Sequence, residues 1–109
     1  MPNLLTCSII DLNMEYIDSL IDDDMYGSFV LGFGRISGNF KPDFYGYGKI
    51  KQELIKYLGS KYQGFIYQET TNEIEAYISL CDYYHNNRQY NTTHPVPPTG
   101  VRCPHCYPQ

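Results

Sequence analysis

The fold is organised around residues 27–36, Gly27-Ser28-Phe29-Val30-Leu31-Gly32-Phe33-Gly34-Arg35-Ile36. Apolar side chains occupy consecutive positions in this stretch, which predicts a strand that is buried on both of its faces. The glycines within it permit a bulge or the close approach of another backbone. A sheet that is covered by helices on one or both sides is therefore expected.

Strand and helix signals alternate on both sides of this stretch. Asn13 is a plausible N-cap for the first helix, and the acidic run at residues 22–24 opposes its continuation. Thr70 and Glu73 match a capping box at the start of the third helix. Glycine, proline and asparagine over residues 37–48 predict a loop. The other expected strands are residues 4–12 and 64–68, and the expected helices are residues 14–22, 49–58 and 71–88.

A chain of 109 residues has room for a single hydrophobic core. The sequence therefore predicts an α+β domain over residues 1–90, in which a small three-stranded sheet and three helices follow in the order β-α-β-α-β-α. Residues 91–109 are rich in proline and predict an extended tail that packs back on the third helix.

The composition is that of a folded protein, with 42% hydrophobic and 18% charged residues. Six acidic residues and no basic ones precede Arg35, whereas residues 35–62 hold six basic residues against two acidic ones. No apolar run approaches the roughly 18 residues of a membrane span, and no signal peptide is recognisable. A cytoplasmic location is expected, where cysteines are more readily thiols or metal ligands than disulfides.

One set of side chains has the spacing of a metal site. Cys103 and Cys106 form a C-x-x-C turn, while Cys81 and His85 lie one helical turn apart on the third helix. These four residues predict a structural zinc site, with His94 as a substitute ligand if His85 points elsewhere and Cys7 as a weaker substitute. Two other interpretations stay open at this point: Cys81 as ordinary core beside metal-free tail thiols, or a redox pair.

The stretch Cys103-Pro104-His105-Cys106-Tyr107 resembles the active-site motif of the periplasmic thioredoxin-fold disulfide oxidases over five residues. In that family the motif opens a helix, and the helix N-terminus lowers the pKa of the first cysteine. Only three residues follow Cys106 here, so no family role is carried over to this chain.

Two surfaces could bind a partner. The acidic residues near the first helix could dock on a basic groove by imitating the phosphates of nucleic acid. Lysines interleaved with tyrosines along residues 49–62 have the composition of a nucleic-acid patch, although an ordinary solvated lysine face is favoured. The candidate residues of the acidic surface are Asp18, Asp22, Asp23, Asp24 and Tyr26, and those of the basic surface are Lys49, Lys51, Lys56 and Lys61.

No nucleophile, base and orienting acid stand at spacings typical of an enzyme, so an enzyme is not expected. The sequence instead favours a small, acidic, Tyr-rich binding or regulatory protein that docks on a macromolecular partner, most readily another protein, with zinc as a structural clasp. An inhibitor of a nucleic-acid-handling enzyme, of phage or mobile-element origin, is one such protein. The alternatives are a nucleic-acid-binding module that uses residues 49–62, or a precursor whose C-terminal cysteine motif is chemically modified.

Overall fold

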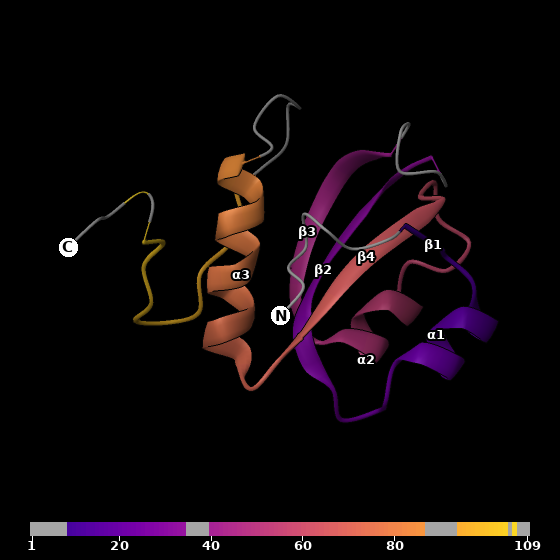
Figure 1. Cartoon of the computed structure of the whole chain (residues 1–109), viewed down its shortest axis with the longest axis horizontal. Helices are drawn as coiled ribbons and strands as arrows, with labels where there is room; N and C mark the ends of the chain where they lie inside the picture. The colour runs from indigo at the N-terminus through magenta and orange to yellow at the C-terminus, as the bar shows by residue number, and fades with distance from the viewer. Residues whose placement is uncertain (1–8, 35–39, 87–93, 105, 107–109) are drawn as a thin grey trace.

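The computed structural model describes residues 9–34, 40–86, 94–104 and 106. Within them the chain forms one four-stranded sheet and three helices (Figure 1). The strand order is β1-β4-β2-β3, and all neighbouring strands are antiparallel. The elements are β1 (Ile10–Asp11), α1 (Met14–Leu20), β2 (Tyr26–Phe33), β3 (Lys41–Lys49), α2 (Ile50–Ile55), β4 (Gly64–Thr70) and α3 (Glu73–Asn86).

The α+β class is confirmed, but the predicted three-stranded sheet and its alternating order are wrong. The missed element is β3, which occupies much of the segment that glycine and proline marked as a loop. An edge strand tolerates Pro42, because one side of its backbone makes no ladder hydrogen bonds. Gly46 is opposite Phe29, and a Cβ at this glycine would lie 2.3 Å from the Phe29 Cζ atom. This glycine therefore leaves room for the central aromatic ring instead of forming a turn.

Most other elements lie close to their predicted positions, with different bounds. The strand expected over residues 4–12 is limited to Ile10–Asp11 among the described residues, and its first five residues lie outside them. The Asn13 cap is confirmed, since its side-chain oxygen accepts a hydrogen bond of 2.9 Å from the Tyr16 backbone N–H. The predicted capping box is displaced: Asn72, not Thr70, accepts from the backbone N–H of the third residue onward, Glu75.

The sheet separates two apolar layers. Side chains alternate along β2, so that Phe29 and Leu31 pack towards α1 and α2, whereas Val30 packs towards α3. Figure 1 shows α1 and α2 on one side of the sheet and α3 on the other. Because α3 is held against three strands, it provides a firm support for side chains on its outer surface.

The C-terminal segment, described over residues 94–104 and 106, lies beside α3 on the side away from α1 and α2 (Figure 1). The Tyr47 hydroxyl on β3 donates a hydrogen bond to the Val96 carbonyl. Further along, Val101 and Cys103 pack with Tyr77 of α3. The predicted division of the chain at residue 90 stays a prediction. Among the described residues, no helix combines the length and hydropathy needed to cross a membrane.

Candidate metal centre

Four potential metal ligands meet where the last turn of α3 faces the C-terminal segment. They are His85 from α3 and His94, Cys103 and Cys106 from the segment, and their ligand atoms all lie within 4.8 Å of one another. His85 reaches this point because Leu80, Cys81 and Tyr83 take the buried positions of the same helix. The structure thus brings together three of the predicted metal residues, His85, Cys103 and Cys106, and His94 joins them beside His85 instead of replacing it.

The distances within this cluster agree with those of a tetrahedral metal site. Nε2 of His85 is 3.4 Å from Sγ of Cys103 and 3.5 Å from Sγ of Cys106, and Nε2 of His94 is 3.6 Å from Sγ of Cys106. A tetrahedral zinc ion, with bonds of about 2.0–2.1 Å to nitrogen and about 2.3 Å to sulfur, places nitrogen and sulfur ligands about 3.6 Å apart. Two imidazoles and two thiolates are also a donor set that zinc prefers.

The His94 ring is held in the form that a metal requires. Its Nδ1 atom lies 2.7 Å from the Pro95 carbonyl oxygen. Because a carbonyl only accepts hydrogen bonds, this contact favours the tautomer with the proton on Nδ1, which is the one that can bind a metal through Nε2. The rings of Tyr84 and His85 contact the His94 ring edge-on, with centroids 4.9 and 5.3 Å away, and so restrict its rotation.

Cys81, the remaining predicted ligand, lies in the core behind this cluster. Its side chain is fully buried and packs with Tyr77 and Cys103. Burial raises the pKa of the Cys81 thiol to about 12, so this thiol is neutral at physiological pH. The Cys81 side chain is hydrogen-bonded to those of Tyr77 and Cys103. Cys81 therefore supports a ligand through a hydrogen bond.

A cavity of about 530 Å³ adjoins the cluster. Its lining includes three of the four cluster residues, His94, Cys103 and Cys106, together with Tyr77, Pro97, Val101 and Arg102. Solvent molecules and small solutes can therefore approach the two sulfur atoms from this side.

No family model, curated protein or solved structure matches this chain. The chemistry of its candidate site thus has to be argued from its own residues.

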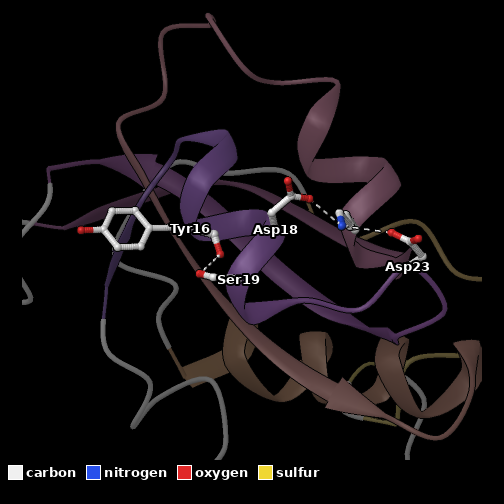
Figure 2. A network of polar contacts seen from close by, with 5 residues as sticks. Tyr16, Asp18, Ser19 and Asp23 are labelled. Atoms are coloured by element: carbon white, nitrogen blue, oxygen red, sulfur yellow. Dashed lines mark hydrogen bonds and ion pairs between the residues drawn. The ribbon is translucent and has the colours of Figure 1, made fainter.

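The predicted acidic surface is partly neutralised within the molecule. Nζ of Lys51 on α2 lies 2.7 Å from a carboxylate oxygen of Asp18 and 3.0 Å from one of Asp23, as the dashed lines in Figure 2 show. These two hydrogen bonds raise the pKa of Lys51. Asp22 and Asp24 are exposed beside this bridge, and Tyr26 stands at the start of β2 with the Lys49 ammonium 6.0 Å from its ring centroid.

The predicted basic surface does not present a row of unengaged lysines. Besides Lys51, Lys56 pairs with Glu53 at 2.8 Å. Lys61 lies 3.7 Å from a carboxylate oxygen of Asp43 and above the Tyr62 ring. That carboxylate also accepts from the Tyr62 hydroxyl, and burial together with this bond raises the pKa of Tyr62 to about 12. Phosphate binding would have to compete with these internal pairs.

Sequence reasoning placed His94 second because Cys81 and His85 have the regular spacing of neighbours on one helix face. The signal that favours His94 is the pattern H-x8-H-x8-C-x2-C. In this pattern His94 directly precedes the Pro-rich part of the sequence. Such spacing sets the reach of the connections, but it does not say which donor the segment turns inwards.

Proposed function

We propose that this protein is a small zinc-binding domain in which the metal fastens the C-terminal segment to α3, and that it acts by binding a partner instead of by catalysis. The observation that carries the metal part is the convergence of two imidazoles and two thiols, drawn from α3 and the segment, within 4.8 Å. Four protein ligands complete a tetrahedron, which is typical of structural zinc and leaves no position for a substrate.

Metal binding can be tested on the purified full chain. We expect one equivalent of zinc, and cobalt substitution is expected to produce the visible absorption of a tetrahedral ion with sulfur-to-cobalt charge transfer. The matched control is a Cys103→Ser/Cys106→Ser variant, which lacks both thiolates. Purified protein that takes up no zinc, or a cobalt complex without sulfur charge transfer, would refute the proposed site.

The binding role is supported by the outer surface of α1. Tyr16 and Leu20 lie one turn apart on this helix and are 46% and 42% exposed, although both are large and largely apolar. The helix and the turn after it are also acidic: Glu15 and Asp22 are exposed, and Asp18 and Asp23 pair with Lys51. An exposed apolar pair on an acidic helix suits a partner surface that offers an apolar side chain and basic neighbours.

This surface can be tested by photocrosslinking in cells that express the protein. A photoreactive phenylalanine analogue at Tyr16 is expected to join the protein to a discrete partner, and charge reversal at Asp22 and Asp24 is expected to reduce the yield. The same analogue at Ile74 serves as the control, since Ile74 is 49% exposed but lies on α3. Equal crosslinking from both positions would contradict a role for the α1 surface.

A further inference from the structure

The two sulfur ligands of the cluster differ sharply in accessibility. Cys103 is 2% exposed and packs between Tyr77, Cys81 and Val101, whereas Cys106 is exposed. Both line the cavity of about 530 Å³. A small solute in this cavity therefore reaches the exposed Cys106 sulfur more readily than the buried Cys103 sulfur.

The same two sulfurs can bond to each other only if the metal leaves. They belong to one C-x-x-C turn and lie within 4.8 Å of each other. In a tetrahedral zinc site two sulfurs stand about 3.8 Å apart, whereas a disulfide requires about 2.05 Å. Metal and disulfide are thus mutually exclusive states of the same pair of residues.

The buried thiol is poorly placed for first attack. Cys81 is fully buried and is not part of the cavity lining. It nevertheless contacts Cys103, so a bond between these two cysteines is the main competing product.

Loss of the metal would weaken the attachment of the C-terminal segment to α3. Three of the four ligands belong to this segment, and His85 alone belongs to α3. Without the metal, the described attachments of the segment include its packing on Tyr77 and Cys81, the ring contacts of His94 with Tyr84 and His85, and the hydrogen bond from Tyr47 to Val96. Its hold on α3 then depends on weaker, non-covalent contacts.

On the basis of the proposed zinc site, we propose that the attachment of the C-terminal segment to α3 is controlled by oxidation. A peroxide joins Cys103 and Cys106 in a disulfide, which releases the metal and loosens the segment. The Cys106 thiolate attacks one peroxide oxygen; the O–O bond breaks, hydroxide leaves and a sulfenic acid forms. The Cys103 thiolate then attacks that sulfur, so that the S–S bond forms and the S–O bond breaks. The two sulfurs lose two electrons, hydrogen peroxide is reduced, and two protons from solvent complete two molecules of water.

The test uses the zinc-loaded full chain and hydrogen peroxide. We expect complete loss of bound zinc, followed with a chromogenic chelator, and one Cys103–Cys106 disulfide for each zinc released, identified by peptide mass mapping. Dithiothreitol followed by fresh zinc is expected to restore the loaded state, which separates disulfide formation from irreversible oxidation. Proteolytic cleavage in the segment 95–102 is expected to become faster on oxidation and slower again on reduction.

A matched variant identifies the reacting pair. Cys7→Ser/Cys81→Ser retains only the two cysteines of the C-x-x-C turn, and we expect peroxide still to release its zinc, with one Cys103–Cys106 disulfide for each zinc. Zinc that stays bound in peroxide, or a variant that no longer releases it, would overturn the redox inference and leave the zinc site intact. A chain that binds no zinc before peroxide is added would instead refute the proposed site itself.

Discussion

Replacement of His94 by alanine is expected to lower the affinity for zinc by roughly 100-fold or more, because a first-sphere imidazole is lost and removal even of an outer hydrogen-bonding partner costs about 10–100-fold. For the zinc-saturated protein, a 100-fold weaker affinity corresponds to about 2.7 kcal/mol of lost stabilisation. The measurement is a competition titration against a chromogenic chelator, with thermal unfolding recorded in the presence and absence of zinc.

The comparison variant is Cys81→Ser. It distinguishes the ligand set with His94, which the structure brings together, from the set with Cys81, which the sequence predicted. Cys81 lies behind Cys103 in the core and is hydrogen-bonded to it, but it is not one of the four converging ligands. We expect its effect on zinc affinity to remain below about tenfold, the lower end of the range for outer-sphere partners. If Cys81→Ser abolished binding while His94→Ala preserved it, the set Cys81, His85, Cys103 and Cys106 that the sequence predicted would be the correct one.

Replacement of Phe29 by alanine is expected to lower the free energy of unfolding by about 3–5 kcal/mol, the range found for large aromatic side chains in cores. Phe29 is fully buried on β2, stands over Gly46 and lies with its ring centroid 6.2 Å from that of Phe44. Neither neighbour can fill the resulting cavity without moving the edge strand. Urea denaturation followed by circular dichroism measures the change.

Ile74→Ala is the control for this second experiment, because Ile74 is 49% exposed and its truncation leaves no cavity. Its expected effect is within about 0.5 kcal/mol, as for most surface substitutions. A Phe29→Ala protein that unfolds at the same urea concentration as this control would contradict the assignment of Phe29 to the centre of the core.

Local sequence signals were sufficient to predict the helices and the central strand β2, but they did not predict the edge strand β3. The apolar run around Phe29 and the Asn13 cap each depend on residues that are neighbours in sequence. The strand status of β3 depends instead on Phe29, which lies opposite Gly46 across the ladder. A glycine that accommodates a distant ring cannot be distinguished in sequence from a glycine in a turn.

The same division applies to the candidate metal centre. The C-x-x-C turn with His85 was accessible from spacing, because the turn and the helix each fix the direction of their own side chains. The fourth donor was not, because the choice between Cys81 and His94 depends on the path of the segment over α3. That path is determined by long-range contacts such as the bond from Tyr47 to Val96 and the packing of Cys103 on Tyr77.

Helix α3 contacts the sheet through Leu80 and Tyr83 and carries His85 at its last turn. If the proposed ion binds the docked helix more tightly than the undocked one, docking raises the affinity for the ion by the same factor by which the bound ion favours docking. Mutations of the sheet layer and the concentration of available zinc are thus two controls on a single thermodynamic cycle.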